Sequence, residues 1–154
     1  MARRFWLAKS EPSTYSWSDF VDEGSTCWDG VRNAQARNNL QEMKKGDPVL
    51  FYHSNQGKEV VGVARVTKES HPDPSSDDPR WVVVELAPLR ALVEPVSLAR
   101  IKADAALARI PLVTQSRLSV MPLEQSAFER ILRLGKTRLE AAGSRRAAQP
   151  ASRR

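Results

Sequence analysis

Runs of apolar residues rich in valine and aromatic side chains recur along the first two thirds of the chain. Such runs, bounded by Gly, Pro, Asn or Asp, are typical of β-strands. They predict strands at 4–9, 48–53, 59–68, 81–87 and 89–94. The last two are separated at Pro88, because proline cannot donate to a sheet ladder. Residues 55–57 are predicted to form a turn, and 71–79 an exposed acidic loop.

Apolar residues at helical spacing predict helices between and after these strands. The first begins at Ser16, with Asp19 in the capping-box position, and ends at Gly24. Further helices are predicted at 34–43, 97–107 and 122–134. The segment 28–31 has the composition of a turn, and 112–120 is mixed. About five strands with short helices set among them indicate an α+β fold built on a small barrel.

Length and composition are those of one globular domain. The chain has 154 residues, of which 41% are hydrophobic and 27% charged. Its apolar runs are far shorter than the roughly 20 residues that span a bilayer. The apolar run near the N-terminus ends at Lys9, too early for a secretory signal. We therefore expect a cytoplasmic protein with no membrane partner.

The net charge of +6 is concentrated at the C-terminus. Residues 136–154 contain six basic side chains and one acidic side chain, a net charge of +5, which leaves +1 for residues 1–135. This tail has no aromatic residue and one leucine, so it cannot bury enough apolar area to offset its ordering entropy. We predict a folded domain at 1–135 and a disordered basic tail. The tail either binds phosphate backbone or is simply a solvated end.

Residue types that carry catalysis or bind metals are sparse. Cys27 is the single cysteine, and His53 and His71 are the two histidines. Their spacing matches no metal site, so no metal or cofactor is expected. Lys9 and Ser10 are adjacent, but neighbouring side chains of a strand point to opposite faces. We predict no catalytic residues, and Cys27 is interpreted as a packed thiol.

The segment 28–39 concentrates side chains suited to recognising a base. It holds one tryptophan, two arginines and three asparagines within twelve residues. Tryptophan offers a stacking surface, asparagine a donor and acceptor for a base edge, and arginine a planar fork for phosphate. These are the groups needed to hold a base turned out of its stack. In the alternative interpretation, Asn33 caps the helix that begins at 34 and Trp28 belongs to the core.

Four separated motifs resemble the EVE domain in order and spacing. They are FWLAKSEP at 5–12, WDGVRNAQARN at 28–38, GDPVLFYHS at 46–54 and RLSVMPL at 117–123. The resemblance covers roughly residues 3–135. It implies a PUA-like pseudo-barrel of about five to six strands with short flanking helices and a pocket on its side. Related families are the thymocyte nuclear proteins and the YTH readers of methylated adenine.

The resemblance also implies a set of base-binding residues. Lys9 and Ser10 fall where the YTH readers have a Lys-Ser pair, and Trp28 falls where they have one wall of an aromatic cage. Trp81 is the candidate for the second wall, with Tyr52 behind it. The shared EVE motifs add Asn33, Arg37, Asn38, His53, Arg117 and Ser119. Trp6 and Trp17 are assigned to the core.

The resemblance implies a non-catalytic reader of a modified base in DNA or RNA, with modified cytosine favoured. Its partner would be nucleic acid that carries this base. The alternative is a small amidohydrolase, because some PUA-like relatives of the ASCH type are amidohydrolases that use lysine, threonine and glutamate. A third alternative is a protein-interaction module whose aromatic pocket holds a peptide or a small metabolite.

Overall fold

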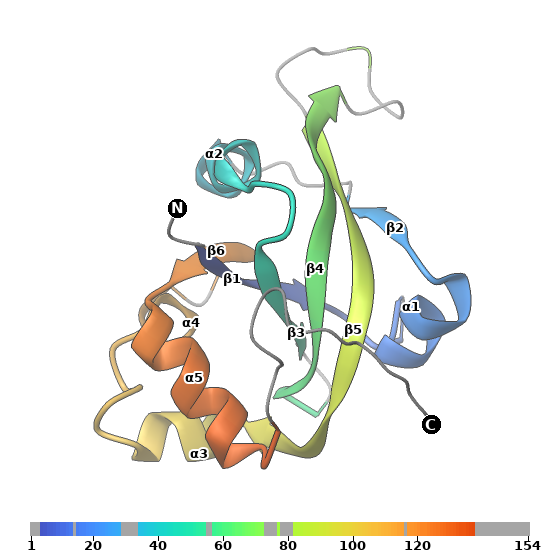
Figure 1. Ribbon diagram of the computed structural model, residues 1–154. Helices are drawn as coiled ribbons and strands as arrows, with labels where there is room; N and C mark the ends of the chain where they lie inside the picture. The colour runs from blue at the N-terminus through green and yellow to red at the C-terminus, as the bar shows by residue number, and fades with distance from the viewer. Residues whose placement is uncertain are drawn as a thin grey trace.

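One mixed β-sheet organises the fold (Figure 1). The computed structural model describes residues 4–13, 15–28, 34–54, 57–72, 77, 82–115 and 117–137. The strands are β1 (Phe5–Ser10), β2 (Thr26–Trp28), β3 (Pro48–His53), β4 (Glu59–Pro72), β5 (Val82–Ser97) and β6 (Val120–Leu123). Their spatial order is β2-β5-β4-β3-β1-β6. β1 and β3 are parallel, and the other neighbours are antiparallel.

In the part of the chain that the structure describes, five helices flank this sheet. They are α1 (Trp17–Glu23), α2 (Ala34–Glu42), α3 (Leu98–Ala103), α4 (Pro111–Thr114) and α5 (Gln125–Leu134). The described strands do not close into a barrel, because β2 and β6 are the two ends of the sheet order. α2 contacts β6, β5 and β4, and so connects one edge of the sheet with strands toward the other. The predicted α+β, PUA-like architecture is confirmed as an open, six-stranded form.

Aromatic side chains form the part of the core that supports α1. Phe20 of α1 stacks on Phe51 of β3, with ring centroids 5.3 Å apart and planes 18° from parallel. Trp17 meets both rings edge-on, at 5.5 Å and 5.3 Å. Its indole also covers Gly62 of β4, where a Cβ atom would lie 2.5 Å from Trp17 Cη2. Trp17, predicted to belong to the core, is partly buried and packs against the core.

The N-terminal end of β1 is held by the buried carboxylate of Asp47. Trp6 is fully buried, as predicted, and its Nε1 donates to Asp47 Oδ2 at 3.0 Å. The same oxygen accepts the Lys44 N–H at 3.0 Å, which closes the turn before β3. These hydrogen bonds compensate the burial of Asp47, since a buried charge without partners would be costly.

Several predicted elements are confirmed with small boundary shifts. β1, β3 and α2 lie where the apolar patterns place them. Ser16 and Asp19 form the reciprocal capping box of α1, and Gly24 ends this helix in the left-handed conformation. Leu40 and Met43 are both buried, as the helical spacing of α2 predicts.

The prediction that Pro88 divides two strands is wrong. β5 is continuous from Val82 to Ser97, and Pro88 pairs with Ala64 at a register shift of the ladder. A bulge tolerates proline because its ladder hydrogen bond is already interrupted. β4 is also longer than predicted: His71 and Pro72 belong to this strand and not to the loop.

Three further boundaries differ from the prediction. Trp28, predicted as the first residue of a turn, is the last residue of the short strand β2, and 29–31 lie outside the described residues. Pro122 belongs to β6, an edge strand where proline is tolerated, so α5 begins only at Gln125. α3 ends at Ala103, earlier than predicted, and turns follow it.

The described chain ends against β5. Thr137 is buried; its Oγ1 accepts the Val93 N–H at 2.8 Å and donates to the Gly135 carbonyl at 2.9 Å. Lys136 forms an ion pair with Glu94 at 3.0 Å. The first two residues of the predicted tail therefore pack on the domain, and 138–154 lie outside the described residues.

Packing of Trp17 on Gly62 gives a test of the fold. We expect Gly62→Ala to lower the free energy of unfolding by about 1–3 kcal/mol, because the added methyl group overpacks the Trp17 ring. Urea denaturation measures this change. In the Trp17→Leu background the same substitution should cost clearly less, since the clash is relieved. An equal cost in both backgrounds would contradict the packing described here.

Candidate functional site

The carboxyl ends of β1 and β3 bring four of the predicted site residues together. In this parallel pair Lys9 lies beside Tyr52, and Ser10 lies beside His53. The Lys9 N–H donates to the carbonyl of Ser119, just before β6, at 2.8 Å. Lys9, Ser10, His53 and Ser119 therefore meet at one edge of the structure. Strand alternation directs the Lys9 and Ser10 side chains to opposite faces of the sheet.

α2 adds polar groups next to this edge. Asn39 Nδ2 donates to the Val120 carbonyl at 2.7 Å and so ties α2 to the start of β6. Arg37, half-buried, approaches the exposed Asn38 with Nη2 3.5 Å from Oδ1. Arg117 is exposed in the turn two residues before Ser119. α2 thus carries two predicted site residues, Arg37 and Asn38, on the helix that Asn39 ties to the start of β6.

Asn39, which links α2 to β6, was not among the site residues predicted from the sequence. The signal was present in the helical period, because Asn39 falls between the buried residues Ala36 and Leu40 on the turn that faces the sheet. An amide at such a position commonly satisfies a backbone group that would otherwise be unpaired.

Trp28 joins the site through other aromatic rings. It pairs with Val84 of β5, and only 8% of its surface is exposed. Its ring centroid lies 5.6 Å from that of Phe51, at 83°, and 6.5 Å from that of Tyr15, at 74°. Phe51 in turn lies 5.8 Å from the His53 ring. Trp28 therefore belongs to the aromatic core as well as to the neighbourhood of His53.

The second wall of the predicted aromatic cage is not defined by the described residues. Asn33 and Trp81 both lie outside them. Tyr52 is buried beside Lys9 and adjacent to Phe51 in the strand. Its side chain therefore leaves β3 on the face opposite to Phe51, the ring that contacts Trp28.

Hydrogen bonding fixes the protonation state of His53. Its Nε2 accepts the backbone N–H of Trp17 at 3.0 Å, so this nitrogen carries no proton. Burial lowers the pKa of His53, and the negative charge of Glu59 opposes this effect. Burial likewise lowers the pKa of Lys9. The imidazole of His53 is thus neutral, and the ammonium group of Lys9, on the other face of the sheet, is partly dehydrated.

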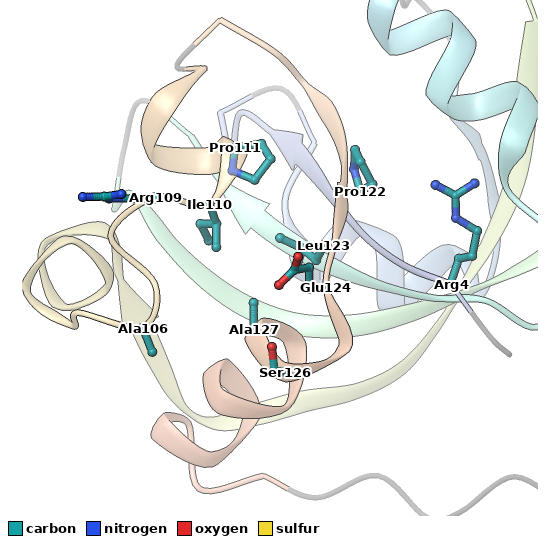
Figure 2. A pocket seen from close by; sticks show the side chains of 10 residues that line it. All are labelled: Arg4, Ala106, Arg109, Ile110, Pro111, Pro122, Leu123, Glu124, Ser126 and Ala127. Atoms are coloured by element: carbon teal, nitrogen blue, oxygen red, sulfur yellow. The ribbon is translucent and has the colours of Figure 1, made fainter.

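A cavity of about 570 Å³ lies elsewhere, between β6, the start of α5 and the loop before α4 (Figure 2). Arg4, Arg109, Pro122 and Glu124 are among the residues that line it. None of the predicted base-binding residues that the structure describes lines it. The cavity and the site predicted from the sequence are therefore two different places on the molecule.

Within the described ranges, no three His, Cys, Asp or Glu side chains are grouped so that they could hold a metal ion. Over the same residues, no helix is long and apolar enough to cross a membrane.

Comparison with known proteins identifies the family. The model of the EVE domain matches residues 4–134, and the chain belongs to the EVE domain family. Thymocyte nuclear protein 1 of Mus musculus is 36% identical over 167 residues, which cover 86% of this chain and 74% of that protein.

Two solved structures share this architecture closely. A crystal structure of a protein from Agrobacterium tumefaciens has 42% identity and a TM-score of 0.86, and the match covers 87% of this chain and 94% of that one. Human THYN1, solved in complex with DNA containing 5-methylcytosine, has 34% identity and a TM-score of 0.80, with 88% and 99% covered. The expected kinship with the thymocyte nuclear proteins is confirmed.

Protonation of His53 should destabilise the fold. The folded pKa lies below that of the unfolded chain, about 6.5, so the native state binds fewer protons. This contribution to stability is fully present above pH 6.5 and is lost as the pH falls through the folded pKa. Melting temperatures measured between pH 5 and 8 should therefore decrease in acid.

A non-titrating variant provides the control for this pH dependence. His53→Gln keeps an acceptor for the Trp17 N–H, and its melting temperature should vary less across the same range. His71→Gln, which changes the other histidine, should retain the wild-type profile. An unaltered pH dependence in His53→Gln would show that another group is responsible.

Proposed function

We propose that this protein is a non-catalytic reader of a modified base, with modified cytosine in DNA as the favoured ligand. The observation that carries the proposal is the position of Ser10 and His53 beside the aromatic rings of Phe51 and Trp28, at the same edge where the Lys9 N–H bonds the Ser119 carbonyl. The human relative solved with DNA containing 5-methylcytosine supports the choice of ligand.

The residue types around this edge suit the separate tasks of such a reader. Aromatic rings stack on a base that has left the duplex, at roughly 1–3 kcal/mol per base. Asn38 offers a donor and an acceptor to a base edge, while Arg37 and Arg117 supply positive charge for the flanking phosphates. A flipped base also needs a site that excludes water, and the buried rings of Phe51 and Trp28 provide apolar surroundings.

Because so little of Trp28 is exposed, stacking of a base on it requires local opening of the side chains around the ring. Tyr15 is the neighbour best placed to take part, since it is only half-buried and meets Trp28 edge-on. We therefore propose Tyr15 and Trp28 together as the aromatic contact of the base.

The orientation of the Ser10 hydroxyl argues against a catalytic role for Ser10 in this proposal. Its hydroxyl donates to the carbonyl of Tyr15, and Lys9 leaves β1 on the other face of the sheet. Lys9 therefore cannot activate Ser10 as a nucleophile. Turnover of acylated nucleosides that disappears in Lys9→Ala would instead favour the amidohydrolase alternative.

Trp28→Leu tests the aromatic contact. Leucine preserves an apolar side chain but removes the aromatic face, so affinity for a 5-methylcytosine oligonucleotide should fall about 5- to 150-fold. Fluorescence anisotropy with two oligonucleotides that differ only in this methyl group measures affinity and selectivity together. Matched RNA oligonucleotides distinguish the two nucleic acids.

Trp6→Phe is the matched control for the loss of a buried tryptophan. Trp6 lies at the other end of the sheet core, bound to Asp47, so its substitution should lower the melting temperature without changing affinity. If folded Trp28→Leu binds the methylated oligonucleotide as wild type does, Trp28 is not part of the site.

The tail gives a separate, salt-dependent prediction. We propose that its five arginines after Thr137 contact phosphates without reading sequence. Each phosphate contact on duplex DNA contributes about 0.9 to the slope of log affinity against log salt concentration. Deleting 138–154 should therefore flatten the slope by roughly 4 if most of the arginines are engaged, and selectivity for the methylated base should survive.

This truncation keeps the packing of Lys136 and Thr137 on β5, so the domain itself is left intact. Trp28→Leu should have the reverse effect, with selectivity reduced and the salt slope nearly unchanged. If the slope is the same with and without 138–154, the tail is only a solvated end.

A further inference from the structure

Two side chains at the carboxyl ends of β1 and β3 hold the segment that enters α1. Ser10 Oγ donates to the carbonyl of Tyr15, and His53 Nε2 accepts the N–H of Trp17 at 3.0 Å. Ser10 and His53 are register partners in the parallel pair, so they lie side by side. They bind the backbone on either side of Ser16 and together form what we call the Ser10–His53 clasp.

The held segment carries the aromatic rings of the site. The Tyr15 ring meets Trp28 edge-on at 6.5 Å, and the Trp17 ring lies on Phe51 and over Gly62. Ser16, between them, caps α1. Release of either end of the clasp would therefore alter both the first turn of α1 and the position of Tyr15 against Trp28.

The sequence motifs place Ser10 and His53 among the base-binding residues, and each already uses one hydrogen-bonding group within the protein. The Ser10 proton is donated to the Tyr15 carbonyl and His53 Nε2 accepts the Trp17 N–H, which leaves the Ser10 oxygen as an acceptor and His53 Nδ1–H as a donor. Through the two bonds already made, both side chains act on the ligand by way of the segment that they hold.

We propose that Ser10 and His53 are positioning residues, which hold Tyr15 and Trp28 in the geometry that binds the base, and that protonation of His53 opens the clasp and weakens binding. This inference rests on the proposed function. A protonated imidazole has donors on both nitrogens, so it repels the Trp17 N–H and ends the hydrogen bond.

Charged groups on the neighbouring elements influence the pH at which His53 is protonated and the clasp opens. Glu59 of β4 faces His53 as its register partner and favours the protonated ring. The partner on β1 is the uncharged Ser10. On α1 the nearest acidic residue in the first turn is Asp19, whose carboxylate already accepts the Ser16 N–H at 3.0 Å. Burial opposes protonation and keeps the clasp closed at neutral pH.

The experiment is a pH series of affinity for a 5-methylcytosine oligonucleotide between pH 5.5 and 8. Wild-type affinity should fall toward acid, by about tenfold for each pH unit below the His53 pKa. A general gain of positive charge would change affinity in the opposite direction, because it strengthens phosphate contacts. His71→Gln is the control and should follow the wild-type curve.

Three variants separate positioning from a merely structural role. In His53→Gln the affinity should become independent of pH, because the amide oxygen accepts the Trp17 N–H without titrating. Ser10→Ala should weaken binding about tenfold across the whole pH range, and Ser10→Thr, which keeps the hydroxyl, should recover most of the loss. A His53→Gln curve that still falls in acid as the wild-type curve does would overturn the proposal.

The clasp can also be measured without any ligand, which separates its failure from that of the proposed function. In ¹⁵N-labelled protein at pH 8, His53 should be the tautomer with the proton on Nδ1, with a coupling across the hydrogen bond between the Trp17 amide and Nε2. The opposite tautomer overturns the clasp even if the oligonucleotide binds. The expected tautomer in a protein that binds no modified oligonucleotide would overturn the proposed function alone.

Discussion

The parallel pairing of β1 with β3 is the constraint on which the site depends. Parallel neighbours end at the same edge of a sheet, so Ser10 and His53 reach it together although 43 residues separate them in the chain. The antiparallel strand β6 then brings Ser119 to the same edge, where its carbonyl accepts the Lys9 N–H. With an antiparallel β1–β3 pair these groups would lie at opposite ends of the sheet.

Local signals in the sequence predicted much of the fold, since strand runs and helix caps are encoded within a few residues. The capping box at Ser16 and the strand at 48–53 are examples. What the sequence did not predict depends on partners distant in the chain. Pro88 continues β5 because the ladder with β4 shifts register there, and three-residue β2 exists only through its pairing with β5. Neither feature has a local pattern.

For the site, sequence motifs identified residues that do come together, but not what their side chains do. Ser10 and His53 bind the backbone of the segment before α1, and this role depends on β1–β3 pairing that no motif specifies. Tyr15 and Asn39 were missed because their contacts join residues that are distant in the chain, although the position of Asn39 in the helical period did carry a signal. Asn39 bonds a carbonyl 81 positions away, and Tyr15 acquires its importance from contact with Trp28 across the sheet.

We propose that base recognition takes place at the carboxyl ends of β1 and β3 and away from the cavity near α5. The most direct measurement compares amide chemical shifts of the protein with two oligonucleotides that differ only in one cytosine methyl group. The account predicts that the differences concentrate at Ser10, Tyr15, His53 and Ser119. Differences concentrated at Leu123, Glu124 and Ala127, which line the cavity, would contradict it.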